Sequence, residues 1–313
     1  MADITTFSEV ANGDRLYQTY FNSLKRSLHT WPTSDVTVPI TAYNQTTGIV
    51  TLDPTRVYHF SSFTMTGGSL TISGQGVPLM IFVDGVSMIG GYVDLNGKGY
   101  APGSGSNNST VGQNGKDLAP DWNTGFDGGG GVGGGINHLA GTGGTFTGFS
   151  PSQIGSTIAN MCSIACGAGG GGGVGAGAGT TNIGGTAGSG GGALLFYSHG
   201  NLTISGTVDL SGTAGKAGSH AATSDGAGGG GGGAGGMAIF ITEGTFASGT
   251  ATYLYPGGIG GAGKIGEAGT SGRGGGGGGG GASMAGTSGI EGAGSVGGSG
   301  GIGGSGTIFA ITG

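Results

Sequence analysis

Glycine tracts constrain this chain more than any other feature, because 87 of its 313 residues are glycine. Most lie after residue 104, and the longest unbroken run is Gly274–Gly281. Glycine loses more backbone entropy on ordering than other residues, about 0.5–1 kcal/mol more than alanine. Extended glycine with three residues per turn can offset this loss. Its bare backbones approach from every side, and each N–H···O=C bond contributes roughly 0.5–1.5 kcal/mol.

The ends of the tracts favour ordered packing over flexible linkers. Three of them run directly into apolar strand-like sequence, at Ala193–Phe196, Met237–Phe240 and Thr307–Phe309. A flexible linker has no reason to join apolar strands repeatedly in the same way. A collagen triple helix is excluded, because it needs a strict Gly-X-Y period and abundant proline, whereas this chain has 8 prolines and an irregular glycine period.

Composition divides the chain into three regions: residues 1–35, 36–103 and 104–313. The first region predicts a helix over Asp14–His29, with an apolar stripe at helical spacing and Pro32 as its stop. Such a short helix is marginal alone in water, so we expect it to dock on its own domain or on a partner. The residues proposed for attachment are Leu16, Tyr20, Phe21 and Leu24.

Residues 36–103 predict a β-rich domain. Its β-branched and aromatic runs are Val36–Val38, Gly48–Leu52, Val57–Phe63 and Ser69–Ile72, with a turn at Asp53-Pro54.

An apolar strand, a turn and an alternating strand then recur at Leu79–Gly97, Leu194–Gly212 and Ala238–Thr252, and Thr307–Gly313 repeats the first strand. Equivalent glycines are 115, 44 and 69 residues apart, which is not a regular solenoid period. We interpret the unit as a recurring β-hairpin. The predicted fold is mostly β: an N-terminal helix and small β region, then β-hairpin units joined to a packed polyglycine-II-like domain with loops.

Charge and targeting patterns exclude several classes of function. The net charge is −6, and no basic stripe for nucleic acid lies beyond Lys25-Arg26. The N-terminal sequence does not match a signal peptide, and no apolar run reaches 18 residues, so no membrane insertion is expected. Cys162 and Cys166 are interpreted as small buried residues, with no further metal ligands near them in sequence.

The tracts Gly167–Gly179, Gly226–Gly236 and Gly272–Gly281 resemble the polyglycine motifs of distal-tip adhesins on the long tail fibres of T-even-type phages. The resemblance covers roughly residues 125–313, and the first 100 residues do not match that family's fibre-binding domain. It implies a polyglycine-II sandwich whose loops bind a bacterial receptor. The corresponding loops here would be Tyr100–Phe126, Asn137–Phe149, Thr213–Asp225 and Ala282–Gly289.

From this resemblance we expect a virion or extracellular-surface protein. Its partners would be a protein or glycan receptor and other virion tail or fibre proteins, and homo-oligomerisation is left open. Aromatic and polar side chains suit such a receptor face, and the candidates are Trp122, Asn123, Phe126, His138, Phe146 and Phe149. The alternative is a purely structural virion or filament subunit. An ice-binding protein is a third hypothesis, disfavoured by the large non-glycine islands.

Catalytic motifs are not evident in the sequence. The five histidines form no HExxH pair, no glycine tract leads into Lys-Ser or Lys-Thr, and G-x-G-x-x-G strings arise by chance in such a composition. Asp121 and Asp127 leave glycan cleavage by paired carboxylates as an open alternative. The sequence therefore predicts a non-enzyme without cofactor or metal.

Overall fold

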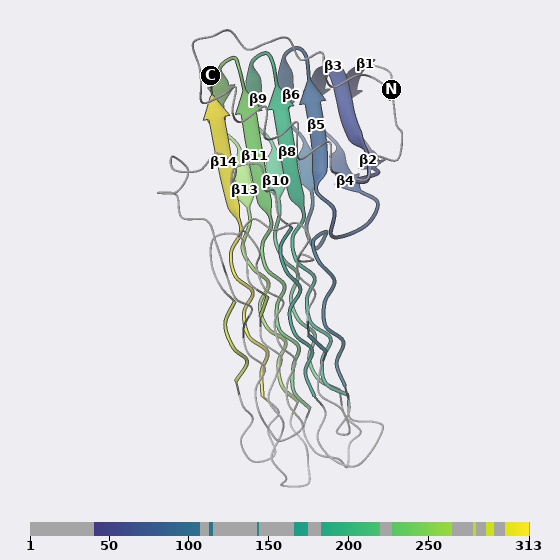
Figure 1. Cartoon of the computed structure of the whole chain (residues 1–313), viewed down its shortest axis with the longest axis vertical. Coiled ribbons are helices and arrows are strands. Elements are labelled where there is room, and N and C mark those ends of the chain that lie inside the picture. The colour runs from purple at the N-terminus through teal and green to yellow at the C-terminus, as the bar shows by residue number, and fades with distance from the viewer. Residues whose placement is uncertain are drawn as a thin grey trace, which may run out of the picture.

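The computed structural model describes residues 41–106, 113–114, 143, 166–174, 183–219, 227–264, 278–279, 286–290 and 298–312. Its strands form two sheets at one end of an elongated molecule, and extended glycine-rich segments run side by side from the sheets toward the other end (Figure 1). We call this bundle of segments the rod. Within the described residues no helix is long and apolar enough to cross a membrane.

The larger sheet, sheet A, contains nine of the described strands, in the order β12-β9-β6-β3-β5-β8-β11-β14 with β1 also paired to β3. Their bounds are β1 Thr41–Gln45, β3 Val57–Met65, β5 Leu79–Val83, β6 Ser87–Ile89, β8 Ala193–Ser198, β9 Leu202–Ile204, β11 Met237–Thr242, β12 Phe246–Ala247 and β14 Thr307–Thr312.

Sheet B has the order β13-β10-β7-β4-β2. Its strands are β2 Ile49–Leu52, β4 Ser69–Ile72, β7 Tyr92–Asp94, β10 Thr207–Asp209 and β13 Thr252–Leu254. Every strand pair in both sheets is parallel, and strands on both sides of residue 103 pair with each other, as β5 does with β8 and β7 with β10.

The predicted β-hairpins are therefore wrong, although the predicted strand positions agree closely with β2 to β5. Consecutive strands do not pair with each other: the chain passes through sheet A, turns, and returns in sheet B. At the turn before β7, a Cβ on Gly91 would lie 2.7 Å from the Gly68 carbonyl oxygen of the preceding turn, so successive turns stack closely. In the repeated units, such as β5, β6 and β7, two strands lie in sheet A and face the third, in sheet B, through side chains, and hydrogen bonds form between successive units.

The described residues contain no helix, so the helical part of the predicted fold has no counterpart among them. Asp14–His29, with the attachment candidates Leu16, Tyr20, Phe21 and Leu24, lies outside the described residues.

The core explains why the strands of sheet A are apolar throughout. In β5, Leu79, Ile81 and Val83 pack between the two sheets, whereas Met80 and Phe82 belong to a second cluster on the other face of sheet A. Burial on both faces is typical of parallel strands and requires a continuous apolar run. Strand β4 of sheet B instead alternates partly and fully buried residues, so only one of its faces is fully covered.

Buried Cys166 belongs to the second cluster, and burial raises the pKa of its thiol to about 12. At pH 8 the thiolate fraction is then on the order of one in 10⁴, and the thiolate is the reactive species. In a Cys162→Ser variant we expect no measurable reaction of Cys166 with a thiol reagent until the protein unfolds. Stopped-flow detection of thiol modification, with and without denaturant, checks this. Fast modification of the folded variant would contradict the buried position.

Candidate functional site

The rod is the candidate functional feature of the molecule, because its segments pack together with almost no side-chain core. Its main segments are residues 99–106, 166–174, 183–192, 210–219, 227–236, 255–264 and 298–306, with shorter pieces at 278–279 and 286–290. Segments 183–192, 227–236 and 298–306 lead directly into β8, β11 and β14, and segments 210–219 and 255–264 follow β10 and β13. The chain therefore runs up and down the rod between successive passes through the sheets.

Hydrogen bonds in the rod repeat every three residues. The amides of Gly185, Gly188 and Gly191 donate to the carbonyls of Gly228, Gly231 and Ala234, at 2.7 to 2.8 Å between nitrogen and oxygen. This repeat is that of an extended helix with three residues per turn, for which the rise is about 3.1 Å per residue. The ten residues 227–236 then span roughly 31 Å.

Segment 227–236 is the centre of this lattice. Each amide from Gly228 to Gly236 donates a backbone hydrogen bond, and successive amides donate in rotation to segments 166–174, 298–306 and 210–219. Its carbonyls accept from 183–192, 255–264 and Gly279. Six different segments thus surround one strand, all of its residues are buried, and hydrogen bonding replaces the apolar packing that an ordinary core would use.

Close contact between backbones makes glycine necessary at these positions. A Cβ on Gly188 would lie 1.8 Å from the Thr213 carbonyl oxygen, and one on Gly233 would lie 1.9 Å from that of Ser189. Both distances are far shorter than a van der Waals contact, so a side chain there would force neighbouring segments apart. Larger residues occur where the three-residue period directs them outward, as at Thr186 and Ser189, which are partly exposed.

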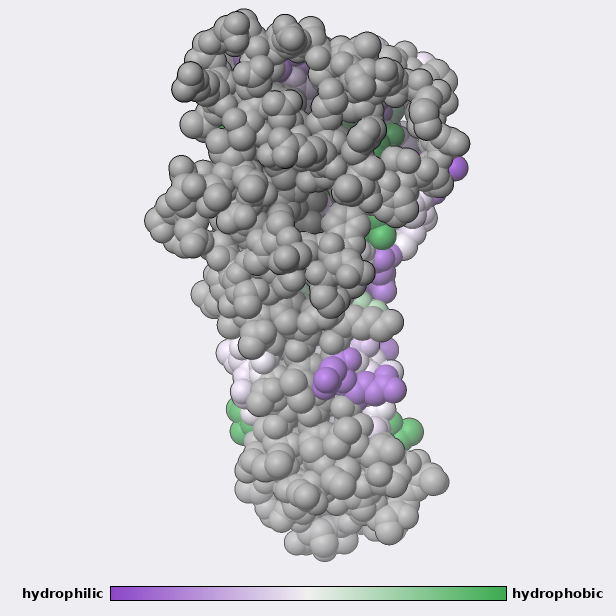
Figure 2. Space-filling model, viewed as in Figure 1, coloured by the Kyte–Doolittle hydropathy of each residue, from purple (hydrophilic) through white to green (hydrophobic). Residues whose placement is uncertain are grey.

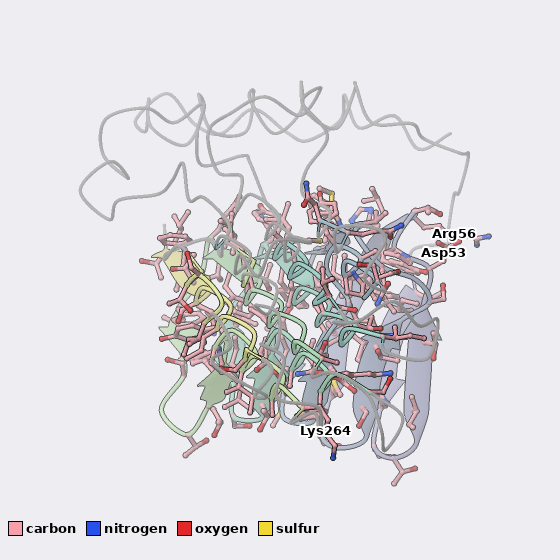
Figure 3. The ribbon with its side chains drawn as sticks, turned by 90° about the horizontal axis from the view of Figure 1, so that it is seen from below. Asp53, Arg56 and Lys264 are labelled. Atoms are coloured by element: carbon pink, nitrogen blue, oxygen red, sulfur yellow. The ribbon has the colours of Figure 1, made fainter. Side chains whose placement is uncertain are left out.

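Several described segments of the rod end or begin beside one another at its far end. Three backbone bridges lie there, Ser106 with Val174, Ile183 with Ser219, and Ala227 with Lys264. We call these six residues the distal end. Figure 3, which looks along the molecule from below, shows the Lys264 side chain pointing outward from the molecule. It is well separated from the Asp53–Arg56 ion pair of the sheet region.

The candidate receptor residues Trp122, Asn123, Phe126, His138, Phe146 and Phe149 lie outside the described residues, as do Asp121 and Asp127. The structure does locate parts of all four predicted receptor loops, including Gly143 of the second, whose amide donates to the Ser288 hydroxyl oxygen. Residues 100–106 and 213–219 lie in rod segments. The Thr287 amide donates a hydrogen bond to the Ile302 carbonyl of segment 298–306. These parts are hydrogen-bonded into the rod, so fewer residues of the predicted loops remain as candidates for receptor binding.

A polar cluster in the sheet region joins strands that are distant in sequence. The Tyr197 hydroxyl donates to Glu243, whose other carboxylate oxygen lies 2.6 Å from His199 Nδ1, and His59 Nε2 lies 2.6 Å from Asp84 Oδ1. Burial and the bond to Glu243 raise the pKa of Tyr197. These contacts tie the end of β8 to β11 and β3 to β5. Among the described residues no group of His, Cys, Asp or Glu is arranged to hold a metal ion.

Extended glycine with three residues per turn was predicted from the sequence, but the matching three-residue spacing of non-glycine residues inside the tracts was missed. Outward positions are occupied by non-glycine residues at Ile183, Thr186 and Ser189, at Pro256, Ile259 and Ala262, and at Ser299, Ile302 and Ser305. That spacing was a readable signal for the rod. The polar cluster carried no such signal, because Tyr197 and Glu243 are 46 residues apart.

Comparison of the chain with protein families, with curated proteins and with solved structures found no match.

Proposed function

We propose that this protein is an adhesin of a virion tail fibre or tail tip, which displays receptor-binding segments on a polyglycine rod at the outer surface of the particle. The observation that carries the proposal is that several described rod segments end or begin beside one another at the distal end. Described segment 166–174 ends at Val174 and the next begins at Ile183, segment 210–219 ends at Ser219 and the next begins at Ala227, and segment 255–264 ends at Lys264.

A rod of this kind suits display for a physical reason. Its central segment is hydrogen-bonded on six sides, so its ends hold their positions without a bulky side-chain core. Segments attached to fixed ends lose less conformational entropy on binding, which favours affinity. In Figure 2 the visible described surface of the rod combines pale residues near the middle of the hydropathy scale with a hydrophilic patch, and hydrophobic residues lie at both margins.

The proposed receptor residues remain those predicted from the sequence. Between Ser106 of the distal end and Cys166 beside sheet A lie 59 residues, of which the structure describes 113–114 and 143. Their sequence contains Trp122, Phe126, Phe146 and Phe149. Aromatic side chains supply large contact areas at protein interfaces and dominate their energetics. The proposed partner is a protein or glycan on a host cell, and the N-terminal residues would attach the chain to other virion proteins.

We expect Trp122→Ala to weaken binding to host cells at least tenfold, about 1.4 kcal/mol, while leaving thermal unfolding unchanged. The measurement is flow cytometry of the fluorescently labelled full-length chain on a panel of bacterial strains. Tyr255→Ala is the matched control, because this half-exposed aromatic residue lies at the sheet end of the rod rather than at the distal end.

Phe126→Ala and Phe149→Ala extend the test if Trp122 is not itself a contact. Full cell binding by all three folded variants would refute the proposed receptor residues. Absence of binding to any strain by the unmodified chain would instead favour the purely structural virion subunit.

A further inference from the structure

The outer segment 255–264 of the rod has bonded neighbours on only one side. The amides of Gly258 and Gly261 donate to segment 227–236, and its carbonyls accept from segments 210–219 and 298–306. Within the described part of the chain, six of its amides donate no hydrogen bond: Tyr255, Gly257, Ile259, Gly260, Ala262 and Gly263. The rod therefore ends here with donors aligned in the same three-residue register that the interior uses.

Such an edge would be expected to recruit more polyglycine. Unpaired backbone groups in a row are a template for pairing with another chain, which natural proteins usually obstruct. The nearest supply of suitable segments is a second copy of this chain, since every copy carries the same glycine segments. Addition of a second copy would continue the lattice outward from segment 255–264.

Side chains project from the surface of segment 255–264 to which a second copy would add. Within segment 255–264, Cβ atoms on Gly257 and Gly260 would meet carbonyls of segment 298–306, and those on Gly258 and Gly261 would meet carbonyls of segment 210–219. The remaining third of the positions faces outward, and it consists of Pro256, Ile259 and Ala262, all exposed. Ile259 is 67% exposed, so its side chain is not needed to fill a core.

The adjacent segments have similar columns of side chains. Ala214 and Ala217 are exposed on segment 210–219, and Ile302 is 51% exposed on segment 298–306, flanked by the partly exposed Ser299 and Ser305. Inside the rod, added Cβ atoms would lie within about 2 Å of a neighbouring carbonyl at many positions, as at Gly257 and Gly260. A Cβ atom on the outer surface would likewise prevent the backbone of a second copy from approaching closely enough to bond.

We propose that the column Pro256, Ile259 and Ala262, with its neighbours on segments 210–219 and 298–306, terminates the polyglycine lattice and prevents rods of two copies from joining side by side. The inference concerns the solution behaviour of the rod and does not depend on receptor binding. It predicts that glycine at these three positions creates an interface that the unmodified chain lacks.

The test is sedimentation velocity of the full chain carrying Pro256→Gly, Ile259→Gly and Ala262→Gly together. Its self-association should be at least tenfold tighter than that of the unmodified chain. The matched control carries Pro256→Ala and Ile259→Ala with Ala262 unchanged, which shortens the side chains but keeps each Cβ. That control should sediment like the unmodified chain. Ile259→Gly alone serves as a second variant if the triple substitution impairs folding.

Amide hydrogen exchange separates lattice growth from association through partial unfolding. In the associated glycine variant, exchange at Gly257, Gly260 and Gly263 should slow with increasing protein concentration, because these amides would gain acceptors. Glycine variants that fold and sediment like the alanine control would overturn the proposal. So would an alanine control that associates as tightly as the glycine variants, because Cβ atoms would then not be the barrier.

Discussion

Gly233→Ala is expected to lower the free energy of unfolding by about 3 kcal/mol or more, a large effect for one methyl group. The added Cβ would lie 1.9 Å from the Ser189 carbonyl oxygen and 2.3 Å from its carbon. Both are backbone atoms in a neighbouring segment, so no rotamer change relieves the clash. Segment 227–236 has neighbours on six sides, and displacement in any direction breaks other hydrogen bonds.

The ordinary effect of alanine opposes this loss. Replacing glycine by alanine where the backbone is unstrained stabilises a protein by about 0.4–1 kcal/mol through the unfolded state. Gly249→Ala provides that reference, since a Cβ at Gly249 would meet nothing within 4 Å. Denaturant unfolding of both variants, followed by circular dichroism, gives the comparison. Equal stability of the two variants would mean that segment 227–236 is not packed as a lattice.

Phe196→Ala is expected to cost about 3–5 kcal/mol, the usual range for deleting a buried phenylalanine ring. Phe196 is 1% exposed and lies in the cluster between the sheets. Its ring contacts Phe63 edge-on at a centroid distance of 5.2 Å, and the Phe240 ring lies 6.4 Å away. These rings come from β3, β8 and β11, so the cavity would weaken the contact between strands that the sequence separates widely.

Ile49→Ala is the control for this second prediction, because Ile49 is 74% exposed and its truncation should change stability by less than about 0.5 kcal/mol. Thermal unfolding and urea titration measure both variants. A Phe196 variant as stable as the Ile49 variant would contradict the position of the ring in a closed core.

The local sequence determined where the chain forms strands and where its backbones can pack closely because the residues are glycine. The apolar runs at Leu79–Val83 and Ala193–Ser198 became β5 and β8, and their burial on both faces is typical of parallel strands. The glycine tracts between them predicted close backbone packing, and the carbonyl contacts around Gly188 and Gly233 are consistent with it. Both features depend on the residues themselves and on their immediate neighbours.

The candidate receptor residues illustrate where sequence reasoning stops. The choice of these residues, which include Trp122, Phe126 and His138, depends on residue type and on the resemblance to phage adhesins. Their role stays a prediction. The polar cluster of Tyr197, His199 and Glu243 was not predicted, because nothing in the sequence indicates that residues 46 positions apart share a carboxylate.

Tertiary structure alone decided which backbones meet. An apolar strand followed by a turn and a second strand is compatible with a hairpin or with passage to another sheet. Here stacking of successive turns, such as Gly68 on Gly91, favours the second arrangement. In the rod, a bare glycine backbone can bond in six directions, and its sequence does not specify the neighbour in any of them. That choice depends on the sheets, which fix where each segment enters the lattice and in which direction it runs.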